Sequence, residues 1–247
     1  MKSTSPLTPS LEDYLETIYL LHQGSRQVRV RDIAKERQVR AASVTPALKR
    51  LADLGYLEYK QREFIELTEN GKQAARRVYA RHVLLFQFFH DILGMQRDKA
   101  QQEACGLEHA LSDEGMDRFV RLFETITASG AYAAASVDAS GREQLAKEVG
   151  TYSHEQAIKE AGAPLSADAQ TLWTTPSEEE VVVRKVRAKG ELRKKIIDTG
   201  LLPKTRVRKL SHDASTEQIW ILIQDNRIEL TRVEADAVVV NAVVDQI

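Results

Sequence analysis

Residues 30–67, VRDIAKERQVRAASVTPALKRLADLGYLEYKQREFIEL, contain the pattern that decides the fold of the first part of this chain. Apolar residues recur there at helical spacing, Gly55 follows as a helix terminator, and two short runs of β-forming residues come next. A helical pattern over Leu11–Leu21 precedes the stretch. The predicted elements are helices over Val30–Glu36 and Ser43–Leu54, a tight connection over Arg37–Val39, and strands over Tyr56–Tyr59 and Phe64–Leu67. This order is typical of a winged helix-turn-helix, whose last helix enters the major groove of DNA.

Pro46 constrains where the last of these helices begins. Proline has no amide hydrogen and clashes with the preceding turn, so it is tolerated only in the first turn of a helix. Ser43 is a residue type that caps helix N-termini, and as the N-cap it places Pro46 at the third helical position. We therefore expect the helix to begin near Ser43.

Charge is distributed unevenly along the chain. The net charge of all 247 residues is −1, but residues 22–62 contain ten Lys and Arg against four Asp and Glu, a local charge of +6. Such a basic segment is typical of phosphate contacts, although charge alone fits a solvated surface about equally well. With the winged-helix pattern, it predicts that the DNA-binding residues are Arg29, Arg31, Arg40, Ala42, Ser43, Thr45, Pro46, Lys49, Arg50, Lys60 and Arg62.

Two long amphipathic helices are expected after the hairpin. Thr68 suits the N-cap of a helix that runs to about Ile92, and Gly94 marks its end. A second helix is expected from about Asp98 to Thr127. Their broad apolar faces either pack within the chain or are covered by a second copy. Because winged helices commonly read two half-sites, we expect a homodimer.

Six side chains that can bind a divalent transition metal lie on three of the predicted helices. Asp13 and Glu16 share one face of a helix, and Cys105 is followed at i+3 and i+4 by a carboxylate and an imidazole on its own side. Taken singly, an acidic pair is usually a solvated face, and a lone histidine is more often part of the core. The candidate metal ligands are Asp13, Glu16, His82, Cys105, Glu108 and His109.

Three segments resemble the diphtheria toxin repressor and manganese transport regulator (DtxR/MntR) family. These are Leu11–Tyr19 (LEDYLETIY), Arg81–His82 and Glu103–Ser112 (EACGLEHALS), and the resemblance extends over about residues 9–127. It implies a metal-dependent transcriptional repressor that controls metal-uptake genes. It also implies that the first helix and the two later helices enclose the metal, with the six candidates as its principal ligands, and that the later helices form the dimer interface.

The ligand set is a hybrid of the two branches of that family. The iron-sensing branch is similar at Cys105 but has methionine in place of Asp13, whereas the manganese-sensing branch has a carboxylate in place of Cys105. A thiolate favours softer ions and carboxylates suit Mn²⁺, so we expect Mn²⁺ or Fe²⁺ in the cell, and also Co²⁺, Ni²⁺ and Zn²⁺ in vitro. Phe86 and Gln101 replace two ligands of the ancillary site of the iron-sensing branch, which argues against such a site.

The last region is rich in Val and Ile with strand-like alternation. Expected elements are a strand over Val181–Arg187, a helix over Glu191–Pro203 closed by Gly200, and strands near Thr205–Leu210, Gln218–Gln224, Arg227–Leu230 and Val238–Val244. The pattern resembles the FeoA-like, SH3-type barrel fused to many members of the same family. The expected domains are a winged helix-turn-helix (1–70), a helical metal-binding and dimerisation domain (71–128), a partly helical linker (129–176, with helix around 142–161) and a small β-barrel (177–247).

Composition restricts the class of protein further. No run approaches the roughly 20 apolar residues that cross a membrane, and the polar start lacks a secretory signal. The single cysteine suits a reducing compartment, so we expect a cytoplasmic protein without membrane partners. Apart from the metal candidates there is no catalytic constellation, so an enzyme is not expected. The alternatives are a metal-independent winged-helix regulator with Cys105 as a thiol sensor, and a metalloenzyme that uses Cys105, Glu108 and His109.

Overall fold

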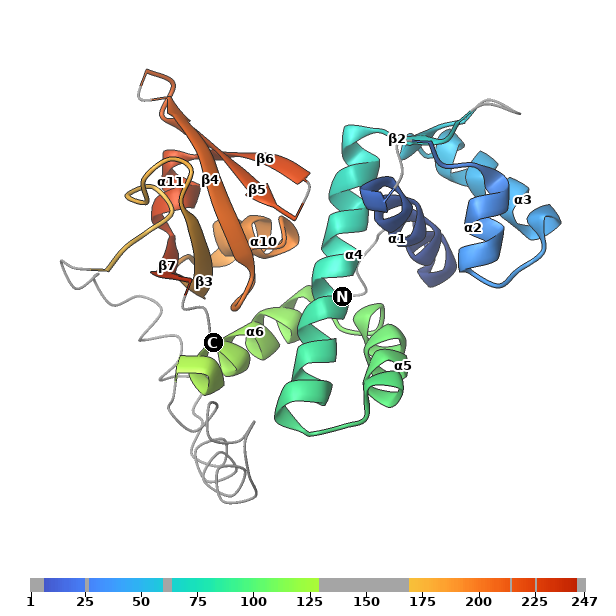
Figure 1. Cartoon of the computed structure of the whole chain (residues 1–247). Helices are drawn as coiled ribbons and strands as arrows, with labels where there is room; N and C mark the ends of the chain where they lie inside the picture. Colours follow the sequence, from blue (N-terminus) through green and yellow to red (C-terminus); the bar gives the residue numbers. More distant parts are fainter. Residues whose placement is uncertain are drawn as a thin grey trace.

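A computed structural model describes residues 7–24, 27–59, 64–128, 169–213, 215–224 and 226–243. Helix α4 (Glu69–Gln87) runs through the middle of the molecule, with a helical head on one side and a β-barrel on the other (Figure 1). The expected architecture, a mainly helical N-terminal half followed by a small antiparallel β-barrel, is confirmed.

The helical head is a winged helix-turn-helix. It consists of α1 (Pro9–Gly24), α2 (Val30–Glu36), α3 (Ala41–Asp53) and the short antiparallel strands β1 (Leu57–Glu58) and β2 (Glu66–Leu67). The helices bury one apolar stripe each, and Leu15, Ile18, Ile33, Leu48 and Leu51 are fully buried together. At helical spacing such residues line one face of each helix, so burial of these faces holds α1 against α2 and α3, the two helices of the reading head.

The predicted start of α3 was wrong. The helix begins at Ala41, with Arg40 as an N-cap in extended conformation, so Pro46 lies inside the helix and beyond its first turn. A proline there removes the hydrogen bond to the carbonyl of Ala42. Both Ala42 and Pro46 are exposed, so water can take the place of the missing donor, and this position tolerates the proline.

The helical middle of the chain also differs from the prediction. Thr68 caps α4 as expected, since its Oγ1 accepts a hydrogen bond from Gly71 N at 3.1 Å. Beyond Gln87 the helix continues as the π-helix η1 (Phe88–Ile92). The single helix expected from Asp98 to Thr127 is two helices, α5 (Arg97–Glu108) and α6 (Asp113–Ala128). They separate because Ser112 Oγ accepts from Gly115 N and caps a new helix.

Gly71, in the first turn of α4, lies directly against the end of the reading head. A Cβ at this position would overlap the carbonyl oxygen of Tyr56, and the same oxygen accepts a hydrogen bond from Thr68 N at 3.1 Å. Only glycine permits this approach of two backbones. The beginning of α4 is therefore in direct contact with the residue that leads into β1.

The C-terminal domain is a five-stranded antiparallel sheet in the order β6-β5-β4-β3-β7. Its elements are β3 (Glu180–Val186), α10 (Gly190–Asp198), β4 (Arg206–Asp213), β5 (Gln218–Ile223), β6 (Asn226–Thr231), α11 (Arg232–Asp236) and β7 (Val238–Ala242). The sequence analysis missed α11, a short helix with a capping box between Thr231 and Glu234. Leu172 is fully buried in the same core, so the chain joins the barrel before β3. Register shifts in β4 and β3 bend these strands, as β-bulges do in small barrels.

A buried ion network ties the barrel to α6. Arg193 of α10 is 1% exposed, and its guanidinium donates to Asp117, to the carbonyl of Val186 and to Glu124 Oε2, the last at 3.1 Å. Glu124 Oε1 accepts from Val186 N at 2.9 Å, so both of its oxygens are used. Ile197 and Leu202 of the barrel domain share a core cluster with Ala80 and Leu84 of α4. The barrel is thus an integral part of the helical body.

Removal of the Arg193 guanidinium should destabilise this body strongly. In Arg193→Met the buried carboxylate of Glu124 loses its cation, which typically costs about 3–5 kcal/mol. Urea unfolding followed by circular dichroism measures the loss. Arg118→Met is the matched control, because Arg118 makes an exposed i,i+4 pair with Glu114 and should contribute under about 1 kcal/mol. Equal stabilities of the two variants would show that the network does not hold the barrel.

Candidate metal centre and DNA-binding face

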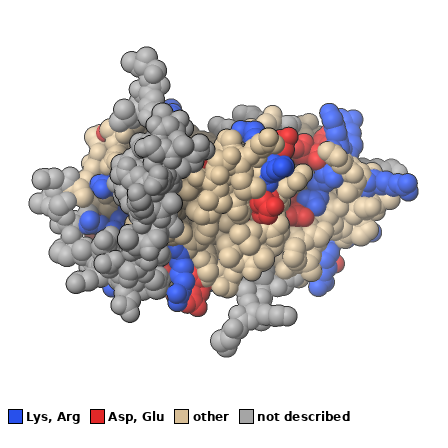
Figure 2. Space-filling view, turned by 90° about the horizontal axis from the view of Figure 1, so that it is seen from below, with Lys and Arg blue, Asp and Glu red and all other residues tan. Residues whose placement is uncertain are grey.

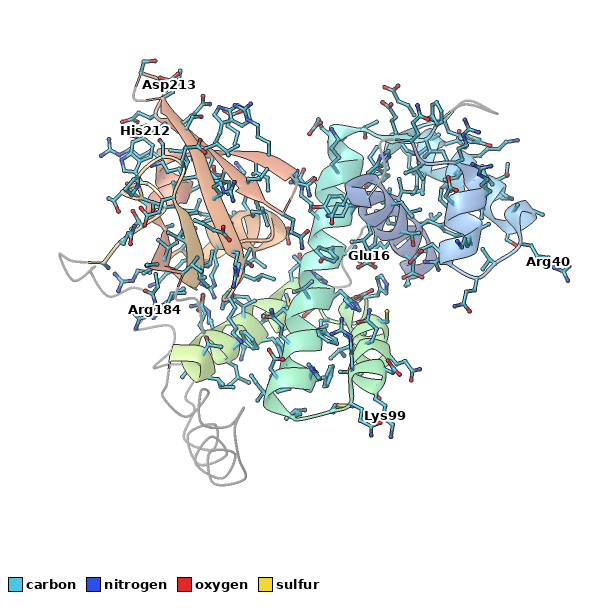
Figure 3. All side chains as sticks on the ribbon, in the orientation of Figure 1. Glu16, Arg40, Lys99, Arg184, His212 and Asp213 are labelled. Atoms are coloured by element: carbon cyan, nitrogen blue, oxygen red, sulfur yellow. The ribbon has the colours of Figure 1, made fainter. Side chains whose placement is uncertain are left out.

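The six predicted metal ligands come together where α1, α4 and α5 pack on one another. Asp13 and Glu16 lie on α1, His82 on α4, Cys105 and Glu108 on α5, and His109 is the residue that ends α5. Glu16 lies on α1 where that helix approaches α4 (Figure 3). Within this group the donor atoms form two clusters.

The first cluster contains His82, Cys105 and Glu108. His82 Nδ1 lies 2.6 Å from Glu108 Oε2 and 3.8 Å from Cys105 Sγ. Burial by itself lowers the pKa of His82, but the contacts with Cys105 and Glu108 outweigh it and raise the pKa to about 10. The other ring nitrogen, His82 Nε2, is 2.8 Å from Gln101 Nε2, which holds the ring in its orientation.

The second cluster contains Asp13, Glu108 and His109. His109 Nε2 lies 2.8 Å from Asp13 Oδ1 and 3.2 Å from Glu108 Oε1, and His109 Nδ1 lies 2.6 Å from Glu12 Oε2. Burial lowers the pKa of His109, but its contacts with Asp13, Glu108 and Glu12 raise it to about 11. Glu108 therefore belongs to both clusters, with one oxygen facing each histidine.

Glu16 completes the ring of carboxylates but makes no comparable bond to either histidine. Burial raises its pKa to about 7, and the neighbouring carboxylates of Glu108 and Asp13 add to the rise, while His82 and His109 act against it. The rise in pKa is thus due first to burial and second to the nearby carboxylates, and a cation bound among these carboxylates would act against it.

The donor set fits a divalent transition metal. Thiolate, imidazole and carboxylate are all ligands of such ions, and within each cluster the donor atoms lie within 4.8 Å of one another. Glu108 is 1% exposed, and its Oε1 accepts no hydrogen bond from the described residues, because the contact with His109 lacks hydrogen-bond geometry. A buried carboxylate oxygen without a donor is costly, and a cation would satisfy it.

Two further residues of this site were missed by the sequence analysis. Arg37, in the turn between α2 and α3, donates to Asp13 Oδ2 at 2.8 Å and lies over the ring of Tyr14. Burial raises the pKa of Asp13, but bonds from His109 and Arg37 outweigh it and lower that pKa. Glu12 is the second missed residue. No spacing rule links Arg37 to Asp13 or Glu12 to His109, because these contacts exist only after the helices pack.

Phe86 and Gln101, which replace two ligands of the ancillary site of the iron-sensing branch, make other contacts in this structure. Gln101 contacts His82, and the ring of Phe86 stacks on His90 with centroids 5.3 Å apart. The guanidinium of Arg97 also lies over the Phe86 ring, 5.4 Å from its centroid. Phe86 is thus part of an aromatic cluster beside the metal candidates.

Most of the predicted DNA-binding residues lie on the outer surface of the head. Arg29, Arg31, Arg40, Ala42, Ser43, Pro46, Lys49 and Arg50 are exposed, and Thr45 is half-buried. Arg40 points away from the body at the start of α3 (Figure 3). Lys and Arg atoms gather at this end of the molecule (Figure 2). Arg29 stacks over Phe64 at 4.8 Å, and Lys60 and Arg62 lie outside the described residues.

Comparisons with known proteins identify three domains in the chain. The model of the iron-dependent repressor N-terminal DNA-binding domain matches residues 6–64. The model of the iron-dependent repressor metal-binding and dimerisation domain matches residues 68–129, and the FeoA domain model matches residues 170–242. An HTH-type transcriptional regulator of Methanocaldococcus jannaschii is 38% identical over 113 residues, which are 45% of this chain and 90% of that protein.

The solved structures that match this chain have lower identity. The metal-dependent transcriptional regulator MtsR is 20% identical, with 96% of this chain and 100% of that chain covered and a TM-score of 0.44. IdeR of T. acidophilum is 18% identical, with 98% and 100% covered and a TM-score of 0.42. A manganese-dependent transcriptional repressor in complex with manganese is 20% identical, with 94% and 100% covered and a TM-score of 0.40.

Co²⁺ should report whether Cys105 is a metal ligand. Under anaerobic conditions the wild-type protein with Co²⁺ should show a thiolate-to-cobalt charge-transfer band in the near ultraviolet. Cys105→Ser should lose this band and keep the visible bands of Co²⁺ held by imidazole and carboxylate. A charge-transfer band that was absent from wild-type protein would remove Cys105 from the site and favour the thiol-sensor alternative.

Proposed function

Because this chain belongs to the iron-dependent repressor (DtxR/MntR) family, a family of transcriptional regulators rather than enzymes, we propose that it is a metal-activated repressor that binds operator DNA as a homodimer. Its targets are genes of metal uptake and homeostasis, and its place is the cytoplasm. In the part of the chain that the structure describes, no helix is long and apolar enough to span a bilayer.

The position of Glu108 is the observation that carries this proposal. It lies between two donor clusters that combine α1, α4 and α5, so a cation bound there draws the three helices together. Helix α1 also contributes Leu15 and Ile18 to the core of the reading head. A bound metal therefore supports the arrangement of the head, and by linkage DNA must tighten metal binding to the same extent.

Arg37 supplies a second connection between metal site and head. Its side chain leaves the turn between α2 and α3 and ends on Asp13, one of the proposed ligands. The turn immediately precedes α3, the helix proposed to enter the major groove. A change in the charge around Asp13 would therefore alter its bond with Arg37 and, through this turn, the position of the start of α3.

The proposed metal is Mn²⁺ or Fe²⁺, and Co²⁺, Ni²⁺ and Zn²⁺ are expected to bind in vitro. The cluster of His82, Cys105 and Glu108 suits a softer ion because of its thiolate. The cluster of Asp13, Glu108 and His109 suits a harder ion such as Mn²⁺. The metal supplies a Lewis-acidic positive charge that neutralises the carboxylates, and the chain supplies all of the orienting contacts.

Dimer formation is proposed to use the helical middle of the chain. Leu93 is 54% exposed, and the adjacent aromatic side chains of Phe86, Phe88, Phe89 and Phe119 are only partly buried. Seen from below, the middle of the molecule carries few charged atoms (Figure 2). Exposed apolar surface of this kind is typical of a protein interface, and a twofold dimer presents two reading heads to two half-sites.

Glu108→Gln should uncouple DNA binding from metal. Operator fragments are first selected from genomic DNA with metal-loaded wild-type protein, and their binding is measured by fluorescence anisotropy without oxygen. The wild-type affinity should rise at least about tenfold with Fe²⁺ or Mn²⁺, within the usual range of allosteric coupling. Glu108→Gln should fold but show no rise, because the shared ligand is lost.

Glu114→Gln is the control for this experiment. Glu114 lies on α6, is exposed and pairs only with Arg118 among the described residues, so its variant should respond to metal as wild type does. A full metal response in Glu108→Gln would refute the proposed site. Oxidant-sensitive binding that ignored metal would instead favour the regulator with Cys105 as sensor.

Arg40→Gln and Lys49→Gln should weaken DNA binding mainly through phosphate contacts. Each replacement should reduce the slope of log K against log salt concentration by about 1. Anisotropy titrations of the metal-loaded protein at four or more salt concentrations give this slope. Arg184→Gln, an exposed arginine on the far side of the barrel (Figure 3), should leave it unchanged. Unaltered slopes in both head variants would place the DNA elsewhere.

A further inference from the structure

A cleft of about 590 Å³ lies between the barrel and the helices α1 and α4. One wall consists of Tyr19 on α1 and Arg76, Tyr79 and Val83 on α4, and the other is the outer face of β4 and β5. In Figure 1 the barrel lies on one side of α4, and α1 and α3 lie on the other side. The cleft therefore belongs neither to the metal centre nor to the proposed DNA-binding face.

The lining of the cleft has an excess of positive charge. It includes four cationic side chains, Arg76, Lys204, Arg206 and Arg208, of which Lys204 pairs with Asp91 at 3.5 Å, and one carboxylate, Glu180. Arg206 and Arg208 are two residues apart on β4, so they project from the same face of the strand, away from the barrel core. An excess of this kind favours an anion that carries several charges.

The arginines are not satisfied by the protein around them. Arg206 Nη1 is 3.9 Å from Glu180 Oε1 and Arg208 Nη2 is 3.6 Å from Glu180 Oε2, so both share one carboxylate through long contacts. Their side chains are 64% and 50% exposed. Across the cleft, Arg76 Nε is buried without a hydrogen-bond partner among the described residues. The exposed guanidinium groups of Arg206 and Arg208 therefore have donors available for a ligand.

The rest of the cleft suits an organic body rather than a bare ion. Leu202, Leu222 and Ile223 form an apolar floor, and Tyr19 and Tyr79 add two rings whose centroids are 6.0 Å apart. Gln224, directly after β5, donates to the Tyr79 hydroxyl at 2.9 Å and is also part of the lining. Pockets for small molecules commonly lie between domains, measure 300–1,000 Å³ and combine an apolar lining with a few polar groups.

We propose that this cleft binds a phosphorylated small molecule of about nucleotide size. The phosphates pair with Arg206 and Arg208, whose forked guanidinium groups match phosphate oxygens two at a time. The organic body lies on the apolar floor beside the tyrosine rings. The proposal uses no residue of the metal centre or of the DNA-binding face, so it stands or falls independently of the proposed repressor function.

Calorimetric titration of the metal-free, full-length protein with ADP tests the proposal. A chelator is present throughout, because phosphates also bind free metal ions, and ionic strength is held constant. Inorganic pyrophosphate and citrate are titrated in parallel. ADP should bind more tightly than pyrophosphate, because only ADP has a body that reaches the apolar floor, and citrate should bind more weakly than either.

Variants locate the site of binding. The double variant Arg206→Gln/Arg208→Gln should lose about a hundredfold in ADP affinity, at roughly tenfold for each charged hydrogen-bonding group. Arg184→Gln on the far side of the barrel and Arg40→Gln on the head should each stay within twofold of wild type (Figure 3). Hydrogen exchange should show ADP-dependent protection in β4 and in residues 76–83.

Four results would each overturn the proposal. These are no binding of ADP at millimolar concentration, an unchanged affinity in the double variant, tighter binding of citrate than of ADP, and loss of binding in Arg40→Gln, which would place the nucleotide on the DNA-binding face. Thermal unfolding of every variant shows whether it is folded, and Arg206 and Arg208 are exposed enough to be replaced without loss of the core.

Discussion

A carboxylate that is buried away from water needs hydrogen-bond donors or cations around it, and Glu108 is the carboxylate of the metal centre to which this applies most strongly. It is almost completely buried, and its two oxygens face His82 and His109 from opposite clusters. His82 comes from α4, and His109 also contacts Asp13 of α1, so these groups surround Glu108 only when α1, α4 and α5 are packed together. The same helices carry the reading head at one end and the aromatic surface at the other. One buried charge thus determines how the two halves of the helical body meet.

The barrel depends on the same helical body through a different kind of contact. Arg193 enters a space between α6 and β3, where Glu124 and Asp117 neutralise it, and Ile197 and Leu202 extend the core of α4 into the barrel domain. Helix α4 therefore has a permanent neighbour on each side. What lies between α4 and the outer face of β4 is not filled by apolar side chains, which is why a charged cleft remains there.

Periodicity in the sequence was sufficient to predict most of the helices and strands, because a helix or strand with one buried face has apolar residues at a regular spacing. It failed where a single side chain decides a boundary. Pro46 was assigned to a first turn, but exposure of the Ala42 carbonyl makes an interior position tolerable. The Ser112 cap splits a helix whose apolar pattern runs on without interruption.

The six metal candidates were proposed from spacing and family resemblance, and the structure brings them together; their role as ligands stays a prediction. Arg37 and Glu12 could not be predicted because their partners lie 24 and 97 residues away in sequence.

Gly71 gives the junction between head and body an unusual mechanical character. Because its backbone rests on the carbonyl of Tyr56 with no side chain between them, there is no compressible layer at this point. Because the two backbones are in direct contact, a small displacement of α4 at His82 would be transmitted to β1 and the wing. In a dimer, the direction of the α4 axis would then determine the distance between the two wings.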